Sequence, residues 1–364
     1  MNRIFSITFL AALAASGLAA AAPAYTTPVG YSTVTFKGGS DTSFAVPLVS
    51  DTKAATVVAS VSGSTLQIGT TLNANELQYV AGTQPKKYFV LVTSGTALGK
   101  YYPVSSNTSS SITVNAIGED LSAISGQTIK VKSFWTLGTL FPSGAGVHVS
   151  TSGGDIKTRV FFNNLNAAGQ NIPRTENYVY LDVAGTANDG WYDANNFAAG
   201  IQNDVVIYPD EFVVVRHPIG SADTTLTNSG EVFGNSLAIP VVVTNSSLGQ
   251  DITAALPYPV AISPSQLGLY ESGAFTASTS GADIKDRLFV YDNNSSGVNK
   301  PLIANYIYFD VAGTANDGWY DANNLGGGKV DLQAVIPANA GLVIRKPINS
   351  AQIALNWVFT APVP

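Results

Sequence analysis

The feature that most constrains this chain is a long internal duplication. Every position from Asp182 to Asn196 is identical to its counterpart in the second copy, which begins at Asp310, an offset of 310 − 182 = 128 residues. The similarity continues on both sides, pairing residues 155–161 with 283–289 and, after a one-residue slip, 216–219 with 345–348. Solenoid repeats span about 20–45 residues, so two copies at this spacing are tandem domains.

The duplication divides the chain into four predicted parts. These are a signal peptide at 1–24, an N-terminal β domain at 25–135, a first repeat module at 136–257 and a second repeat module at 258–364. The N-terminal domain does not carry the repeat, but it has its own series of apolar runs.

Short alternating apolar and polar runs dominate the sequence after the first two dozen residues. Examples are residues 32–36, 55–61 and 88–92, which are separated by Gly, Ser, Asn and Pro turns. This pattern predicts strands at the spacing of sandwiches and barrels. We therefore expect an all-β protein, with an N-terminal β-barrel or sandwich followed by two tandem, homologous, β-sandwich-like modules.

The N-terminal segment is typical of a secretory signal peptide. Arg3 provides a positive charge, an apolar stretch follows, and Ala22-Pro23-Ala24 fits the small-residue cleavage rule. We expect the mature chain to begin near Tyr25 and to be extracellular, on the cell surface or periplasmic. No later segment has about 20 consecutive apolar residues, so no transmembrane span is expected in the mature chain.

The composition narrows the classes of partner. Only 12% of the residues are charged, and the net charge is −6. Without a cluster of Lys and Arg, nucleic acid is not an expected partner. Weak surface charge fits self-association or binding to other envelope proteins. The chain has no Cys, which excludes disulfides, thiolate catalysis and Cys-ligated metals.

Several short motifs resemble an uncharacterised family of exported, β-rich proteins from Verrucomicrobia. The motifs are Val29-Gly-Tyr31, Ser40-Asp41, Val46-Pro-Leu48, residues 99–104, Ser106-Asn107, Gly126, residues 135–141, residues 286–292 and Arg345. The resemblance implies export, bacterial origin and β structure. That family has no assigned function, so it transfers no functional residues. This chain departs from the simplest pattern because it contains two copies of the Trp-bearing loop.

The repeated strand and loop carry aromatic residues that are candidates for binding. With a period of two, Tyr178 and Tyr180 lie on one face and Val179 and Leu181 on the other, where we expect the core. The binding candidates in the two copies are Tyr178, Tyr180, Trp191, Tyr306, Tyr308 and Trp319. They could stack on sugar rings or on a neighbouring protein. Alternatively, the Tyr residues cover a second sheet face and each Trp fills its own core.

The loop after this strand is rich in side-chain oxygens. The candidate Ca²⁺ ligands are Asn188, Asp189, Asp193, Asn316, Asp317 and Asp321. Calcium needs six to eight oxygen ligands, which Asx-rich turns can supply. The spacing does not match the EF-hand loop, and Asn-Asp-Gly is also a common turn former without any metal. Ca²⁺ and simple turns therefore remain alternatives, and no other cofactor is expected.

No catalytic residue is predicted. The two histidines, His148 and His217, lie outside His-x-His, His-Glu-x-x-His and Gly-x-Ser-x-Gly contexts. Three functional hypotheses remain. The first is a non-catalytic cell-envelope or extracellular-matrix protein acting by self-association or adhesion. The second is an extracellular carbohydrate-binding protein that uses the Trp and Tyr loops. The third is a secreted glycoside-active enzyme, for which a pair of carboxylates would be needed.

Overall fold

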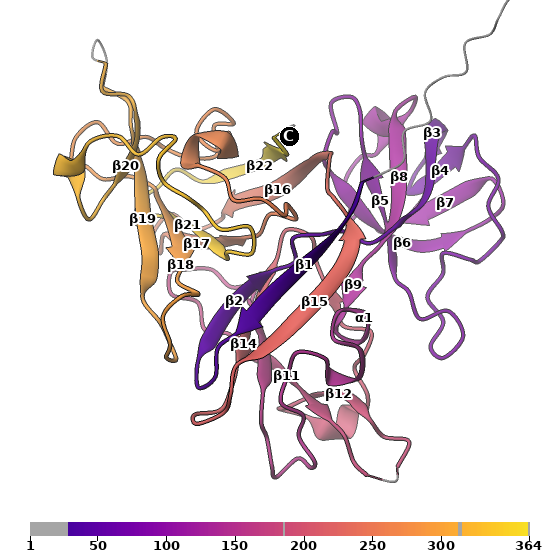
Figure 1. Ribbon diagram of the computed structural model, residues 1–364. Coiled ribbons are helices and arrows are strands. Elements are labelled where there is room, and N and C mark those ends of the chain that lie inside the picture. Colours follow the sequence, from indigo (N-terminus) through magenta and orange to yellow (C-terminus); the bar gives the residue numbers. More distant parts are fainter. Residues whose placement is uncertain (1–27, 185, 312–314, 363–364) are drawn as a thin grey trace, which may run out of the picture.

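The computed structural model describes residues 28–184, 186–311 and 315–362. The predicted signal peptide at 1–24 lies outside these ranges. Within them nearly every regular element is a strand, and the single α-helix is the four-residue α1 (Leu137–Leu140), so the all-β prediction is confirmed. No helix in this part of the chain is long and apolar enough to cross a membrane. Figure 1 shows a barrel beside two larger lobes.

The barrel is built from residues 52–133 and is closed, with the strand order β3-β4-β7-β6-β5-β8. Its elements are β3 (Thr52–Ser62), β4 (Thr65–Ile68), β5 (Tyr88–Val92), β6 (Tyr101–Asn107), β7 (Ser111–Val114), the 3₁₀ turn η1 (Ser122–Ile124) and β8 (Thr128–Ser133). Alternate residues point inward, as a barrel requires. Val58, Leu66, Val90, Ile112 and Val131 are fully buried in its core.

Each repeat is centred on a five-stranded antiparallel sheet. The first sheet contains, in spatial order, β12 (Gly190–Asp193), β11 (Glu176–Leu181), β10 (Arg159–Phe162), β14 (Phe212–Arg216) and β2 (Asp41–Ala45). The second contains β20 (Gly318–Asp321), β19 (Leu302–Phe309), β18 (Arg287–Tyr291), β21 (Leu342–Lys346) and β17 (Gln250–Ala254). The strand order is the same in both, so β2 and β17 occupy equivalent edges.

A two-stranded antiparallel ribbon accompanies each sheet. The ribbons are β1 (Val29–Phe36) with β15 (Thr224–Glu231), and β16 (Ser236–Val243) with β22 (Ile353–Thr360). The remaining elements are β9 (Trp135–Thr136), η2 (Pro142–Gly144), η3 (Phe197–Ala199), β13 (Val206–Ile207), η4 (Pro264–Leu267) and η5 (Leu325–Gly327). Each ribbon packs on one face of its sheet, so that Phe36 and Val213 share one core and Trp357 and Ile344 share the other.

The strand pairing differs from the predicted division of the chain. Strands β1 and β2, placed with the N-terminal domain on sequence grounds, pair with strands of the first repeat. Strands β16 and β17, placed in the first module, pair with strands of the second repeat. The barrel is therefore inserted into the first repeat, after β2. A short similarity supports this arrangement: Asp41-Thr-Ser-Phe-Ala-Val-Pro47 corresponds to Asp251-Ile-Thr-Ala-Ala-Leu-Pro257.

The two sheets also pack on each other through the faces that the ribbons leave free. This shared core contains Phe212 and Val214 from the first sheet and Phe289 and Val343 from the second. Residues of β14 alternate between the shared core and the core under the ribbon, where Val215 lies. Burial on both faces explains why this strand is a continuous apolar run.

Candidate functional site

The aromatic residues predicted to bind a ligand are mostly core residues. Trp191 is fully buried, and its ring centroid lies 5.5 Å from that of Phe141 and 5.7 Å from that of Tyr180. Trp319 is 1% exposed and lies 4.9 Å from Phe275. Neither indole offers a face to a ligand, so each Trp fills the core of its own repeat, which was the alternative considered from the sequence.

The tyrosines follow the same pattern. Tyr180 and Tyr306 are buried, and Tyr178 and Tyr308 are half-buried against the same cores as the two tryptophans. The Tyr face of β11 and β19 therefore points toward the ribbon-covered core, and the expectation that only the aliphatic face lines this core was wrong. Both faces of each sheet are covered by other parts of the protein. The alternation of residues along the strand therefore separates the two faces but does not show which of them packs under the ribbon.

The predicted calcium ligands hold the backbone of their own loops. Asp189 Oδ1 accepts a hydrogen bond from the Val183 N–H at 2.9 Å, and Asp317 Oδ1 accepts one from the Val311 N–H at 2.8 Å. These bonds close the loop between the two strands of each hairpin. The carboxylates are thus used as turn-stabilising acceptors.

The other predicted ligands have similar local partners. Asp193 and Asp321 each accept a hydrogen bond from the amide two residues later, at 2.8 and 2.9 Å. The carbonyls of Asn188 and Asn316 each accept one from the Tyr hydroxyl four residues later. Within the described ranges no group of three or more His, Cys, Asp or Glu side chains could hold a metal ion. The geometry favours the turn interpretation over Ca²⁺.

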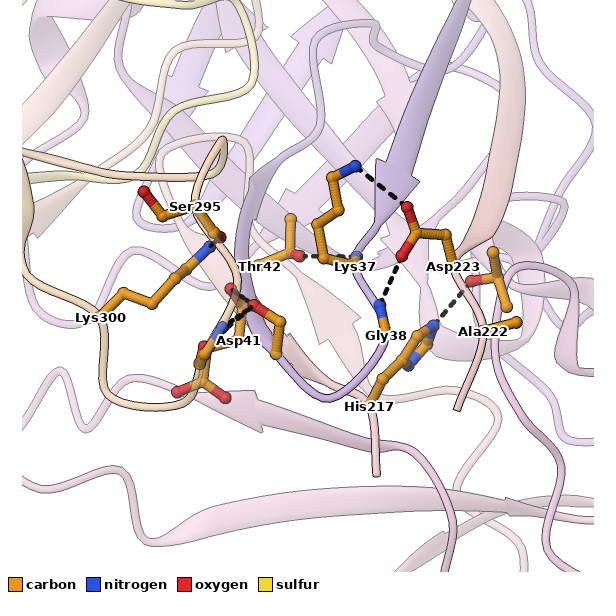
Figure 2. A network of polar contacts seen from close by, with 12 residues as sticks. Lys37, Gly38, Asp41, Thr42, His217, Ala222, Asp223, Ser295 and Lys300 are labelled. Carbon is orange, nitrogen blue, oxygen red and sulfur yellow. Dashed lines mark hydrogen bonds and ion pairs between the residues drawn. The ribbon is translucent and has the colours of Figure 1, made fainter. Parts of the chain in front are cut away.

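A reciprocal interface joins the two repeats. The loop between β18 and β19 packs on the β2 edge, where Asp41 forms an ion pair with Arg216 at 2.6 Å. The Asn299 N–H donates to Asp41 Oδ2 at 2.8 Å, and Arg216 donates to Asn299 Oδ1 at 3.0 Å. Gly297 O accepts from the Asp41 N–H at 3.0 Å. Figure 2 shows Asp41 beside this loop, in which Lys300 donates to the Ser295 carbonyl at 2.9 Å.

The same contacts recur on the other edge. Asp251 of β17 pairs with Arg345, the Asn171 N–H donates to Asp251 Oδ2 at 2.7 Å, and Arg345 donates to Asn171 Oδ1 at 2.7 Å. Gly169 O accepts from the Asp251 N–H at 2.9 Å. The interface is therefore reciprocal, as between two subunits of an isologous dimer.

The two edges nevertheless differ in one respect that creates a cleft. Asn293 accepts from the Ser43 N–H at 2.9 Å and donates to the Ser43 carbonyl at 2.7 Å, which ties its loop onto β2. The equivalent residue of the first repeat is Leu165, which is exposed and lacks the polar atoms for such bonds. Beside β17 the structure instead has a cleft with a volume of about 700 Å³.

The cleft is lined by residues at which the two repeats have diverged. Four pairs of equivalent positions differ, and in each pair the residue named first lines the cleft and carries a charge or an aromatic ring. The pairs are Arg174 and Leu302, Tyr291 and Asn163, Asp210 and Asn339, and Glu211 and Ala340. At each of these pairs the charge or the aromatic ring is present in one copy only. We take this cleft as the candidate functional site.

Two adjacent acidic residues line the cleft, of which Glu211 is buried and Asp210 is half-buried. Asp210 Oδ1 accepts a hydrogen bond from the hydroxyl of Tyr101, a barrel residue, at 2.7 Å, and burial raises the pKa of Asp210. Glu211 is 4% exposed, and burial together with the adjacent Asp210 charge raises the pKa of Glu211 to about 8. Glu211 therefore carries its proton at neutral pH.

Arg174 is the cationic residue that the first repeat adds to the cleft. Its Nε donates to Asn163 Oδ1 at 3.0 Å. Its guanidinium carbon lies 5.7 Å from the ring centroid of Phe212 and 5.5 Å from that of Tyr291. These contacts hold the planar group in one orientation by hydrogen bonding and cation–π attraction.

The barrel contributes one side of the cleft through Ile117. This residue is 89% exposed and has a φ of 50°, in the left-handed region. A β-branched residue is rarely found there, and such outliers concentrate at functional sites. An exposed apolar side chain in this conformation is consistent with a contact surface for a ligand.

Sequence reasoning missed Asp210, Glu211 and Arg174. A signal was present in the alignment of the two repeats, because Tyr208-Pro-Asp-Glu-Phe212 corresponds to Pro337-Ala-Asn-Ala-Gly341. These charges differ between the two copies, whereas the candidates chosen from the sequence lie at positions that the copies share.

Comparison with known proteins gives no further indication of identity. No family model, no curated protein and no solved structure matches this chain.

Proposed function

We propose that this chain is an exported, non-catalytic adhesion protein of a bacterial envelope or extracellular matrix, and that it binds carbohydrate in the cleft between its repeats. The observation that carries this proposal is the cleft itself, formed where the repeats have lost their equivalence. Export rests on the signal-like N-terminus, and bacterial origin on the resemblance to exported verrucomicrobial proteins.

The chemistry of the cleft supports a sugar ligand. Sugars present hydroxyl groups that both donate and accept hydrogen bonds, and apolar ring faces that pack on aromatic side chains. The cleft offers the amide of Asn166, the hydroxyl of Thr253 and the ring of Tyr291. Its volume of about 700 Å³ is in the range of small-ligand sites.

A binding role is better supported than a catalytic one. Glycoside hydrolysis requires two carboxyl groups positioned on either side of the scissile bond. Here Asp251 is paired with Arg345, and Asp210 accepts the Tyr101 hydroxyl. Glu211 forms no ion pair among the described residues, and its hydrogen-bond partners are the backbone groups of Asn163 and Tyr208.

The raised pKa of Glu211 keeps hydrolysis as a second candidate function, since a protonated buried carboxyl is what a general acid requires. Glu211→Gln distinguishes the two. Under the binding proposal, no hydrolysis is detected with wild-type protein on a broad polysaccharide panel, and the variant still binds. Hydrolysis that disappears in Glu211→Gln would establish an enzyme.

Self-association by edge-to-edge strand pairing has less support. The outer strand of each sheet is bridged by a following segment, Tyr192 by Ile201 and Tyr320 by Lys329. Covered edges do not offer free strands to a second copy. Light scattering on the mature protein tests this: we expect a monomer, and regular large particles would support assembly instead.

A glycan array tests the main proposal. We expect the mature protein to bind at least one class of extracellular polysaccharide, and Thr253→Trp, which fills the cleft, to abolish binding. Thr225→Trp is the matched control, because Thr225 is exposed on the β15 ribbon away from the cleft. Binding that survives Thr253→Trp, or an array with no bound glycan, would contradict the proposal.

A further inference from the structure

The orientation of Arg174 leaves part of its guanidinium available to a ligand. Nε is engaged by Asn163, and Phe212 and Tyr291 lie beside the planar group. Among the described residues, Arg174 forms no ion pair, and no acceptor is assigned to its two Nη groups. A fixed guanidinium with free Nη donors matches a carboxylate, which it can bind through two parallel hydrogen bonds.

The balance of charge around the cleft also favours an anion. The carboxylate of Asp251 is neutralised by Arg345, with which it makes two hydrogen bonds of 2.6 and 2.7 Å. Glu211 is protonated at neutral pH, so it adds no charge. Lys300 donates to a carbonyl oxygen, so its positive charge is not cancelled by a hydrogen-bonded carboxylate. Lys300 also lies near the carboxylates of Asp292 and Asp41, so the cation of the lining that favours an anion is Arg174, which forms no ion pair among the described residues.

We infer that the carbohydrate taken by the cleft is an acidic glycan whose sugar carboxylate binds the Arg174 guanidinium. This inference rests on the proposed carbohydrate-binding function and names the ligand class for the same site. The loop of the second repeat provides an internal comparison, because it has Leu302 at the position of Arg174 and its Asn293 closes the β2 edge. Only the loop of the first repeat has the cation, and the β17 edge beside it has the open space.

The negative group assigned to the ligand is a sugar carboxylate. It is planar, and its two oxygens match the guanidinium fork. A protonated Glu211 offers a donor to a further oxygen of the same ligand. A sulfate ester can also bind a guanidinium through two parallel hydrogen bonds, so sulfated sugars are the competing outcome of the test.

The test uses full-length mature protein and calorimetric titration with uronic-acid polysaccharides: polygalacturonate, alginate and a glucuronate-containing glycan. Each is paired with its carboxyl-reduced form, in which the same sugar is neutral, and a sulfated galactan is included. We expect at least one uronic-acid polysaccharide to bind at least tenfold more tightly than its reduced form. Arg174→Leu, which installs the residue of the second repeat, should remove that difference.

Arg159→Leu is the matched control, because Arg159 lies on β10 outside the cleft lining and the substitution removes the same charge. It should leave the affinity within twofold of wild type. Equal binding of acidic and reduced forms, or preference for the sulfated galactan, would overturn the acidic-glycan inference while leaving carbohydrate binding intact. Absence of binding to every polysaccharide would overturn both.

Discussion

At the scale of single residues, the two repeats have different polar pairs at one equivalent buried position. In the first repeat the Thr158 hydroxyl bonds His217 Nδ1 at 2.9 Å, and burial holds the pKa of His217 near 4, so this pair is neutral. At the equivalent positions the second repeat has a buried ion pair between Asp286 and Lys346. A charge in such a place is tolerated only with its partner.

This difference predicts a compensating pair of substitutions in the second repeat. Lys346→His alone leaves the Asp286 carboxylate without its ammonium partner and should lower the free energy of unfolding by about 3–5 kcal/mol. Adding Asp286→Thr recreates the neutral pair of the first repeat and should recover most of that loss. Urea unfolding measures both. A double variant as unstable as the single one would contradict the equivalence of the two sites.

The buried Glu211 predicts how stability depends on pH. Its folded pKa of about 8 exceeds the ordinary value of 4.5, so the native protein holds this proton where the unfolded chain has lost it. Stability should fall as pH rises from 4.5 through 8. The neighbouring titratable groups are Asp210, Glu176, Tyr101 and Tyr208. All four are acids, so none of them favours the ionised form of Glu211.

Glu211→Gln, which cannot ionise, should remove this dependence. Between pH 5 and pH 9 we expect wild-type protein to lose about 4 kcal/mol more than the variant, as measured by chemical unfolding across the range. Parallel pH profiles for the two proteins would show that Glu211 is ionised in the native state at neutral pH.

At the scale of elements, the sequence predicted strand content well and strand partners poorly. The identical segments form the equivalent hairpins β11–β12 and β19–β20, although residues 190–193 and 318–321 were expected to lie in a loop and not in a second strand. The partners of β1 and β2 could not be predicted, because they join β15 and β14 across the whole barrel insertion. Alternation within a strand is local information, whereas pairing across such a distance depends on the packing of the complete repeat.

The candidate site was missed for a related physical reason. The cleft arises where two loops from different repeats meet two different edges, and no single segment contains it. Arg174 and Tyr291 are 117 residues apart in the chain (291 − 174) but belong to one cation–π contact. The repeated aromatic residues were predicted to bind a ligand because they recur in both copies. They recur because each copy must fill its own core.

The close packing of β14 against the start of β21 predicts that a larger residue at position 341 destabilises the protein. Phe212 and Gly341 are equivalent positions, and a Cβ at Gly341 would lie 2.6 Å from a Phe212 ring carbon. Gly341→Ala should therefore overpack the shared core and cost about 1–3 kcal/mol of stability. Adding Phe212→Leu to Gly341→Ala should reduce this loss of stability, because it removes the ring that the new Cβ would contact. Thermal unfolding checks this, and an unchanged melting temperature for Gly341→Ala would show that the sheets can separate without penalty.

At the scale of the whole molecule, two repeats form an internal pseudo-dimer with a barrel inserted into the first. The ends of the insertion are adjacent, since the Ser50 and Ser133 hydroxyls are 2.9 Å apart. Adjacent ends are what allow one domain to be inserted into another without distorting it. The barrel then supplies Ile117 to the cleft lining, and its Tyr101 donates a hydrogen bond to Asp210 of the lining, which links the insertion to the proposed function.

An inserted domain with its own core should fold independently. The barrel has a closed strand order and a separate buried cluster that includes Val58, Leu66 and Val131. We expect residues 51–134, expressed alone, to give a dispersed amide NMR spectrum and a cooperative thermal transition. A collapsed spectrum would show that the barrel depends on the repeats for its stability.

The most direct test of the central claim is hydrogen exchange of the mature protein with and without the acidic polysaccharide that binds best. Binding in the cleft should slow amide exchange in residues 163–174 and 250–253 and in the loop 295–302. The Trp-bearing loops at 186–196 and 315–324 should exchange at the same rate in both states. Slower exchange in the Trp-bearing loops, with no change around the cleft, would contradict binding in the cleft. It would indicate that the repeated aromatic segments bind the ligand.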